Sequence, residues 1–377
     1  MILHLIMLNE KNTYNLFHQM HEYLDLSDHV FLVADFKCNL PNFPKLREFK
    51  NFVFMDAPNR LMRIIKLYKY CKKADHIILN SLLYKTSKYL FFFYFFRSFL
   101  RKATWIEWGA DLYNYRQEKK GLKSKIINHI NYFIRNNVKY VGLTFPGDEY
   151  KYREEFPESK AQCFFTPLPF GKNRIDIMNA ALKKQSEKTH SEVRVQVAHN
   201  SLQINNHYSV LMALSRFKYK NIKVLVPLSY GEFGLNGQYG GNGYKFSVAE
   251  YAKTTFGEKA EILLQMMPIE EYIEYLAGID IAIMSCERPI ALANIYYLLY
   301  MGKKVYLPKN SIQYKYFSKG GYKVFDSDTI DDLSWEEFSA PIKRKIPKAL
   351  SDKFTVGKEI MYWKKLFDQI EKDIGKK

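Results

Sequence analysis

The first half of the chain alternates short, continuously apolar runs with longer segments in which apolar residues recur at helical spacing. Continuous apolar runs are typical of strands buried on both faces of a parallel sheet. The predicted strands are residues 2–8, 30–34, 52–55, 76–80, 103–108 and 140–144, and the predicted helices are residues 14–24, 61–70, 81–100 and 122–136. Regular alternation without long loops predicts a parallel α/β sheet.

The alternation breaks after residue 166, where Pro167 and Pro169 precede a polar, lysine-rich stretch, and then resumes. The second series has predicted strands at 193–198, 222–228, 260–264, 279–284 and 304–308, and predicted helices at 208–217, 246–256, 268–277, 291–301 and 356–374. We therefore predict two doubly wound domains, 1–170 and 191–355, with a linker at 171–190 and a C-terminal helix at 356–377. Such sheets bind ligands outside the carboxyl ends of their strands, so we expect functional residues at strand ends that face a cleft.

Polar residues follow many of these predicted strands directly. In the first domain they are Asn9, Asn80, Glu107, Asp111 and Thr144, and in the second His199, Asn200, Ser201, Ser229, Tyr230, Glu287 and Arg288. Glu107 and Asp111 lie in a run with two tryptophans, residues 105–113, and a carboxylate there suits a general base that deprotonates a hydroxyl nucleophile. The alternative is that Asp111 caps a turn and Glu107 forms a salt bridge.

The second domain offers candidates for binding a nucleotide diphosphate. A turn between a strand and a helix, such as His199–Ser201, favours phosphate through its backbone N–H groups, although Ser201 equally suits a helix cap. Arg288 can neutralise a diphosphate or be a solvated surface residue, and Asn294 can donate to a ligand. The glycine-rich loop from Gly231 to Gly243 lacks a P-loop ending, so we interpret it as a lid or surface loop rather than a phosphate cradle.

The chain carries a formal charge of +18, and aromatic residues make up 16% of it. Such a basic protein attracts polyanions. No acidic residue lies between Asp75 and Glu107, where basic and aromatic residues mix: Lys85, Lys88, Phe92, Phe95, Arg97, Arg101 and Lys102. This mixture predicts a patch that faces an anionic membrane surface. The alternatives are a buried aromatic helix with solvated lysines, or a surface for single-stranded nucleic acid.

Other features of the sequence indicate the cellular compartment. The apolar run 89–96 is shorter than the roughly 20 residues that a membrane span needs. Residues 1–12 lack the basic start and cleavage site of a signal peptide. The four cysteines, Cys38, Cys71, Cys163 and Cys286, have neither zinc-site nor disulfide-framework spacing, which indicates a reducing, cytosolic setting. Most lone cysteines are buried packing residues, and a reactive thiol is the alternative.

The run W-G-A-D-L-Y, residues 108–113, resembles the signature of glycosyltransferase family 56, the dTDP-4-acetamido-4,6-dideoxygalactose transferases of enterobacterial common antigen assembly. Similar segments follow in the same order: 197–201, 226–230 and 280–307. Alanines stand where the family has glycines at Ala198, Ala291 and Ala293. The glycine-rich loop is also longer than in the family.

The resemblance implies a GT-B glycosyltransferase of the hexosyltransferase type, with an N-terminal acceptor domain and a C-terminal nucleotide-sugar domain. It implies no metal or other cofactor, a polyprenyl-diphosphate-linked saccharide acceptor, and peripheral attachment at the cytoplasmic face of the bacterial inner membrane. Asp111 lies inside the matching run and Glu107 does not, and we expect Asn9, Trp108 and Tyr113 to line the acceptor site. The alternatives are a UDP-sugar transferase for capsule or lipopolysaccharide, and a non-catalytic nucleic-acid-binding protein.

Overall fold

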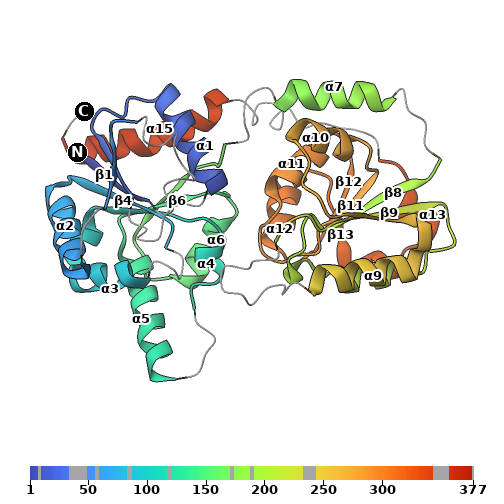
Figure 1. Cartoon of the computed structure of the whole chain (residues 1–377), viewed down its shortest axis with the longest axis horizontal. Helices are drawn as coiled ribbons and strands as arrows, with labels where there is room; N and C mark the ends of the chain where they lie inside the picture. The colour runs from blue at the N-terminus through green and yellow to red at the C-terminus, as the bar shows by residue number, and fades with distance from the viewer. Residues whose placement is uncertain are drawn as a thin grey trace. The chain divides into compact units, whose positions relative to one another are not determined.

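The computed structural model describes residues 1–6, 10–33, 49–55, 59–82, 87–116, 121–169, 174–186, 191–231, 243–342 and 356–375. The chain divides into two compact units. Unit 1 is Met1–Pro169 with Val356–Lys377, and unit 2 is Phe170–Thr355. Each unit is built on its own parallel sheet with helices on both faces (Figure 1). The predicted α/β class is confirmed.

The sheet of unit 1 has the strand order β3-β2-β1-β4-β5-β6-β7, and every described neighbour pair is parallel. The strands are β1 (Ile2–Ile6), β2 (His29–Val33), β3 (Phe52–Phe54), β4 (His76–Asn80), β5 (Ala103–Ile106), β6 (Tyr140–Leu143) and β7 (Gln162–Phe165). The chain adds strands outward from β1 to β3 and then returns to the other side of β1. The winding direction therefore reverses between β1 and β4.

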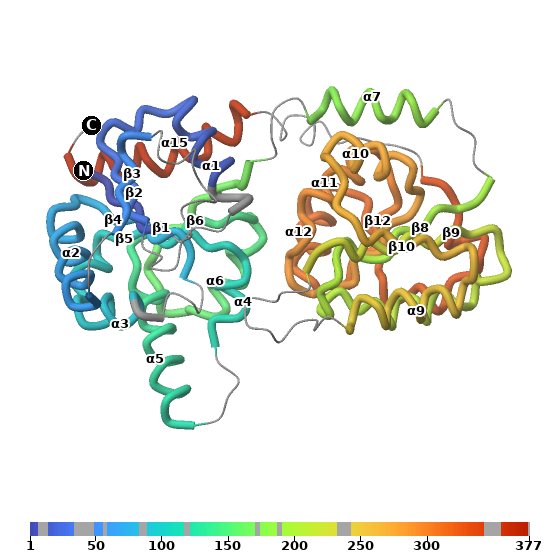
Figure 2. The backbone as a smooth tube through the Cα atoms, in the orientation of Figure 1, coloured from blue at the N-terminus to red at the C-terminus, as the bar shows by residue number. Residues whose placement is uncertain are grey.

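Alternate side chains of these strands enter two separate cores. One face packs on α1 (Glu10–Tyr23) and the C-terminal α15 (Val356–Asp373), through residues such as Phe17 and Trp363. The other face packs on α2 (Arg60–Lys73), α3 (Ser87–Phe95), α5 (Leu122–Asn137) and α6 (Asp148–Glu155). Figure 2 follows α15 back along the sheet of unit 1, where the Trp363 indole donates to the Pro167 carbonyl at 3.0 Å.

Unit 2 repeats the arrangement with the strand order β10-β9-β8-β11-β12-β13. Its strands are β8 (Val193–Val197), β9 (Ile222–Pro227), β10 (Ala260–Leu263), β11 (Ile281–Ile283), β12 (Lys304–Leu307) and β13 (Phe325–Asp326). One core joins the sheet to α7 (Arg174–Ser186), α10 (Ile269–Ala277), α11 (Leu292–Tyr300) and α12 (Ile312–Lys319). The other joins it to α8 (His207–Ser215), α9 (Tyr244–Phe256) and α13 (Trp335–Ser339). Here the winding reverses between β8 and β11.

Some elements differ from the sequence prediction. The single helix predicted at 81–100 is α3 followed by the 3₁₀ helix η4 (Arg97–Lys102). Strands β7 and β13 were not predicted, because both are short edge strands whose residues are only partly buried. The stretch predicted as a linker contains α7, which buries Met178 and Ala181 in the core of unit 2.

Buried histidines make the fold sensitive to acid. In unit 1, His4 Nε2 lies 2.8 Å from His29 Nδ1, and His76 Nε2 lies 2.8 Å from Thr104 Oγ1. Burial, with the positive charge of Lys139, lowers the pKa of His76 to about 3. Burial and the neighbouring His29 hold the pKa of His4 well below its ordinary value. Both imidazoles are therefore neutral in the folded chain.

We expect the free energy of unfolding to fall as pH drops below about 6.5, the pKa of an unfolded histidine. A histidine whose pKa is lower in the folded chain than in the unfolded chain contributes to the free energy of unfolding at pH values above the unfolded pKa. This contribution is lost as the pH falls toward the folded pKa. Each such histidine lowers the free energy of unfolding by about 2 kcal/mol between pH 7.5 and pH 5. Urea titrations at pH 7.5 and 5.0 measure the effect. His76→Gln should lessen the difference between the two pH values, whereas His18→Gln, at an exposed position of α1, should not. An unchanged difference in His76→Gln contradicts the assignment.

Candidate active site

In unit 1 the winding reversal brings the carboxyl ends of β1 and β4 side by side. Open sheets bind ligands at this position because the helices that follow the two strands leave on opposite faces. Asn80 ends β4 and is buried, yet its side-chain Nδ2 has no hydrogen-bond partner among the residues that the structure describes. A buried amide without a partner is costly and indicates a place for a ligand or water. Asn9, predicted beside it, lies outside the described residues.

Asp111 lies next to this edge, in the short helix α4 (Ala110–Tyr113), and only 1% of it is exposed. Its Oδ2 accepts hydrogen bonds from Leu82 N at 2.7 Å and from the Trp105 indole at 2.9 Å. Its Oδ1 accepts from Trp108 N at 2.7 Å. Buried Arg135 donates to the carbonyls of Asp111 and Leu82. Asp111 thus ties the segment after β4 to the segment after β5.

Glu107 follows β5 and is fully buried. Its Oε1 accepts from the backbone N of Thr144 at 2.8 Å and from the Thr144 hydroxyl at 3.0 Å, and its Oε2 accepts from Gly109 N at 2.5 Å. Burial raises the pKa of Glu107 well above its ordinary value, and the carboxylates of Asp148 and Asp111 raise it further. A raised pKa brings a carboxylate closer to the range useful for proton transfer near neutral pH.

The two carboxylates hold an unusual turn between them. Gly109 has φ 74° and ψ −67°, and Ala110 N donates to the Trp108 carbonyl at 2.9 Å. These values define a γ-turn with positive φ, which is rare and strained. Strained backbone persists where surrounding contacts determine it, and such places cluster at functional sites. The hydrogen bonds to Glu107 and Asp111 supply those contacts on either side of Gly109.

Gly109→Ala should lower the free energy of unfolding by about 1–2 kcal/mol, because an L side chain at this positive φ is strained. A Cβ there meets nothing within 4 Å, so the cost comes from the backbone and not from a clash. Gly257 in unit 2 also has positive φ (59°) and open space, and Gly257→Ala is the matched control. We expect only Gly109→Ala to lower kcat as well. Equal kcat values in both variants would show that Gly109 does not contribute to the active site.

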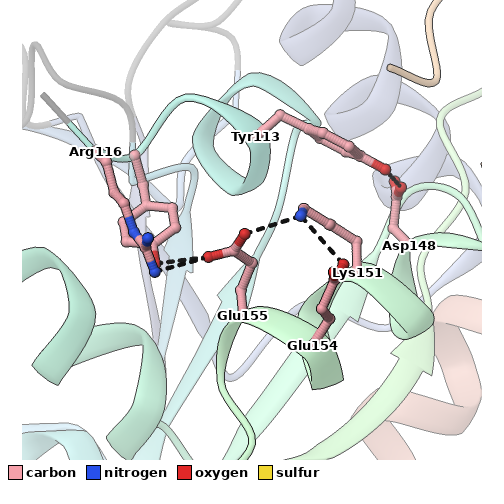
Figure 3. Close-up of polar contacts among 7 residues, drawn as sticks. Tyr113, Arg116, Asp148, Lys151, Glu154 and Glu155 are labelled. Atoms are coloured by element: carbon pink, nitrogen blue, oxygen red, sulfur yellow. Dashed lines mark hydrogen bonds and ion pairs between the residues drawn. The ribbon is translucent and has the colours of Figure 1, made fainter. Parts of the chain in front are cut away.

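A third carboxylate completes this cluster and was not predicted from the sequence. Asp148 begins α6, is 1% exposed, and accepts a hydrogen bond from the Tyr113 hydroxyl at 2.6 Å. Figure 3 shows this contact beside an ionic network in which Glu155 of α6 bonds both Arg116, at 3.0 Å, and Lys151, at 2.8 Å. The segment after β5 is therefore fixed to α6. An acidic residue at a helix start was the only sequence signal for Asp148.

The basic, aromatic segment predicted as a membrane patch is only partly at the surface. Phe95 is 75% exposed, but Phe92 is buried, because its ring packs against Phe93, Phe96 and Phe99 in the core under α3. The Lys102 ammonium also contacts the protein itself, because it donates a hydrogen bond to the Ala74 carbonyl. Arg97 and Arg101 are exposed. Lys85 and the side chain of Lys88 lie outside the described part of the chain.

In unit 2 the reversal lies between β8 and β11, and His199 follows β8 there. Leu202 N donates to Asn200 Oδ1 at 3.0 Å, which fixes the orientation of that amide. Asn200 Nδ2 therefore faces His199 Nε2, at 3.0 Å, and donates to it. Burial lowers the pKa of His199 to about 3, so the ring is neutral and its proton lies on Nδ1. Among the described residues this buried Nδ1–H meets no acceptor with the distance and angle of a hydrogen bond, although the Asn205 side chain is near enough to the ring to oppose the lowering of its pKa.

Contacts between loops place other predicted residues around His199. Ser201 donates from both its backbone N and its hydroxyl to the Tyr230 carbonyl, each at 2.8 Å. Asn206 donates to the Ser285 carbonyl at 2.8 Å, which joins the segment after β8 to the segment after β11. Arg288, in that second segment, is close enough to contribute to the lowered pKa of His199.

The remaining predicted residues of unit 2 differ in burial and contacts. The Ser229 hydroxyl contacts Met266 Sδ at 3.8 Å, and Glu287 is exposed. Asn294 is buried in α11, where it interacts with Tyr272. Residues 232–242 of the glycine-rich loop lie outside the described residues. The structure thus groups His199, Asn200, Ser201, Tyr230 and Arg288 most closely.

Two alanines of this site hold backbone conformations that favour glycine. Ala198 has φ 60° and Ala291 has φ 57°, and both stand where the family resemblance has glycines. Positive φ costs an L residue about 1–2 kcal/mol. Ala198 N donates to the Ile283 carbonyl at 2.9 Å, and the Ala291 carbonyl accepts from Ile295 N at 2.9 Å. The turns after β8 and before α11 therefore adopt the positive-φ conformation that favours glycine, although alanine stands at both positions.

A family model described as "4-alpha-L-fucosyltransferase glycosyl transferase group 56" matches residues 93–337, more than half of the chain. The chain belongs to glycosyltransferase family 56. The matched range contains the carboxylates after β5 and the unit 2 region from β8 to the segment after β11, whereas β1 and β4, which ends at Asn80, precede it. The protein is accordingly a glycosyltransferase, as its W-G-A-D-L-Y run predicted.

Solved structures support the fold over the full length. A glycosyltransferase from Rickettsia africae has a TM-score of 0.66 and 14% identity, with 98% of each chain covered. Anabaena HepE, solved with UDP and glucose, has a TM-score of 0.63 and 10% identity, covering 98% of this chain and 99% of that one. WaaG, a glycosyltransferase of lipopolysaccharide biosynthesis, has a TM-score of 0.52 and 10% identity, covering 99% and 98%. The predicted GT-B fold is confirmed.

Among the described residues no helix is long and apolar enough to cross a bilayer. Within the same part of the chain no group of three or more His, Cys, Asp or Glu side chains is arranged to hold a metal ion.

Proposed function

We propose that this family 56 enzyme transfers a deoxyamino sugar from a nucleotide diphosphate to a polyprenyl-diphosphate-linked glycan. The donor we propose is dTDP-4-acetamido-4,6-dideoxygalactose. The observation that carries the proposal is the unpartnered, buried Nδ1–H of His199 at the winding reversal of unit 2. The mechanism uses His199 and its neighbours for the donor and the Glu107–Asp111 cluster for the acceptor.

On the donor side, a neutral His199 supplies a directed hydrogen bond rather than a positive charge. We assign the positive charge to Arg288, whose guanidinium suits a diphosphate because it donates in a planar fork. Backbone N–H groups of the turn at 199–201 add further donors. These groups stabilise the nucleoside diphosphate that leaves when the glycosidic bond breaks. The base and ribose lie against Ser229, Tyr230 and the segment 266–270 in this proposal.

On the acceptor side, Glu107 acts as the base and Asp111 as a positioning residue. The acceptor hydroxyl oxygen forms a bond to the anomeric carbon, the bond from that carbon to the β-phosphate oxygen breaks, and the hydroxyl proton goes to Glu107. Its raised pKa suits this role. Both carboxylates accept hydrogen bonds from donors of unit 1. We assign the positioning role to Asp111 because it joins the segment after β4 to the segment after β5. Asn80, Trp108 and Tyr113 are proposed to orient the acceptor glycan.

The lipid-linked acceptor implies work at a membrane surface, and we propose peripheral attachment at the cytoplasmic face of the bacterial inner membrane. Exposed Phe95, Arg97 and Arg101 support this. Aromatic and basic side chains together suit the interface of an anionic bilayer.

Binding of dTDP-, UDP- and GDP-sugars, measured by isothermal titration, tests the donor assignment. We expect the dTDP-sugar to bind most tightly, and His199→Phe to weaken it about tenfold through loss of one hydrogen bond to a charged group. Tyr306→Phe removes another buried polar group of unit 2 that has no hydrogen-bond partner among the described residues, and it serves as the control. Equal affinity in both variants would exclude His199 from the donor site.

A UDP-sugar is the second candidate donor. It is favoured by the likeness to HepE, whose structure contains UDP and glucose. Tighter binding of a UDP-sugar than of the dTDP-sugar in the same titration would select it.

A further inference from the structure

Helix α2 (Arg60–Lys73) exposes an uncommon number of large apolar side chains. Leu61 is 66% exposed, Met62 49%, Ile64 41% and Ile65 45%, all within its first two turns. On a soluble surface single apolar residues are ordinary, whereas a contiguous group indicates an interaction site. Asn59 caps the helix by accepting from Met62 N at 2.9 Å, so the exposed group lies on a well-formed helix start.

The rest of α2 is strongly basic. The helix contains six basic residues and no acidic one: Arg60, Arg63, Lys66, Lys69, Lys72 and Lys73. Leu61, Ile65, Lys69 and Lys72 are exposed and recur at helical spacing on the side opposite the buried Leu67 and Cys71. Exposed aliphatic side chains beside lysines suit the interface of an anionic bilayer, where the apolar groups enter the acyl boundary and the ammonium groups contact headgroups.

Neighbouring helices extend the same surface. The Tyr68 ring lies 5.0 Å from Phe96 and 5.7 Å from Phe99, so α2 packs beside the junction of α3 and η4. Figure 1 shows α2 and α3 together along one side of unit 1. This junction adds exposed Phe95 and Arg101 and, like α2, contains no acidic residue in η4 or α3. Exposed basic residues and exposed apolar residues therefore occur together on α2 and on the junction of α3 and η4.

We propose that α2 is the helix that inserts this enzyme into anionic phospholipid membranes, with Leu61 and Ile65 entering the acyl boundary and Lys69 and Lys72 contacting phosphate headgroups. The proposal rests on the function proposed above, because it brings unit 1 to the surface where a polyprenyl-linked acceptor resides. The large exposed apolar side chains of α2 itself, Leu61, Met62, Ile64 and Ile65, are aliphatic, although the neighbouring junction adds Phe95. Nucleic acid would instead need aromatic platforms for base stacking, and Tyr68 and Tyr70 of α2 are half-buried.

Flotation of the purified full chain with liposomes tests the proposal. Vesicles of phosphatidylcholine with roughly one third phosphatidylglycerol are compared with phosphatidylcholine alone, and we expect binding to the anionic vesicles only, weakened by salt. Leu61→Ser/Ile65→Ser and Lys69→Gln/Lys72→Gln should each lower the partition coefficient at least about tenfold. Met212→Ser and Lys253→Gln, at exposed positions of unit 2, are the matched controls and should bind like the parent.

Transfer assays separate this proposal from the proposed function. With a short-chain, water-soluble prenyl-diphosphate acceptor the α2 variants should turn over like the parent, and with the acceptor in anionic liposomes they should be slower. Vesicle binding that persists in both α2 variants overturns the proposal, whatever the donor proves to be. Binding of the parent to single-stranded DNA but not to vesicles also overturns it. Failure of every sugar donor, with flotation as expected, would contradict the proposed function alone.

Discussion

Glu107→Gln is expected to lower kcat by about 10²–10⁴-fold, the usual contribution of a general base, while leaving the Kd of the nucleotide-sugar unchanged. Glutamine preserves the shape of the side chain and can still accept from Thr144 N. Its amide NH2 group cannot accept from Gly109 N and cannot take a proton from the acceptor hydroxyl. Steady-state transfer rates and isothermal titration measure the two quantities. Glu359→Gln, which changes another buried glutamate of unit 1, should alter neither.

The pH dependence of the parent gives a second signature of Glu107. A base works only when deprotonated, so its raised pKa moves the acidic limb of kcat/KM above the ordinary glutamate value of 4.5. The raised pKa of Glu107 also affects the free energy of unfolding. Its contribution is fully present at pH values below the pKa of an unfolded glutamate and is lost as the pH rises through the pKa of Glu107 in the folded chain. Glu107→Gln should remove both effects. Retained turnover in this variant would contradict the base assignment.

Asp111→Ala is expected to lower the free energy of unfolding by about 3–5 kcal/mol, because it leaves buried polar partners without their carboxylate. Leu82 N, the Trp105 indole and Trp108 N all lose their acceptor. Arg135, which burial already disfavours as a cation, loses a neighbouring negative charge. Urea denaturation with the tryptophan fluorescence of unit 1 measures the loss.

Asp75→Ala provides the matched control for Asp111→Ala. Asp75 pairs with the N-terminal ammonium at an exposed position, and exposed pairs contribute about 0–1 kcal/mol. If Asp111→Ala is as stable as this control but has lost turnover, Asp111 and not Glu107 is the base. A large loss of stability, with donor binding by unit 2 retained at low temperature, supports the positioning role.

Much of the fold could be predicted because most strands are buried on both faces. Strand 76–80 then appears as an apolar run between polar ends. Strand ends in turn select Glu107 and His199 as candidates, since ligands of parallel sheets bind there. The half-exposed residues of β7 carry no such signal. Their position at the sheet edge depends on pairing with β6, which is a tertiary property.

Other properties of the site depend on contacts that sequence spacing does not encode. The γ-turn at Gly109 depends on two carboxylates accepting from adjacent backbone N–H groups. The tautomer of His199 depends on the amide of Asn200, which Leu202 N orients. The helix 87–95 is apolar on every side, so the sequence did not distinguish buried Phe92 from exposed Phe95. Exposed Leu61 and Ile65 likewise look like core residues until the helix is placed.

The most direct measurement is a transfer reaction with purified enzyme, radiolabelled dTDP-4-acetamido-4,6-dideoxygalactose and a polyprenyl-diphosphate-linked saccharide, with the products separated as lipid-linked glycans. We predict a product extended by one sugar, its formation lost in Glu107→Gln and weakened in His199→Phe. Absence of this product, with transfer from a UDP-sugar to the same acceptor instead, would contradict the proposed donor.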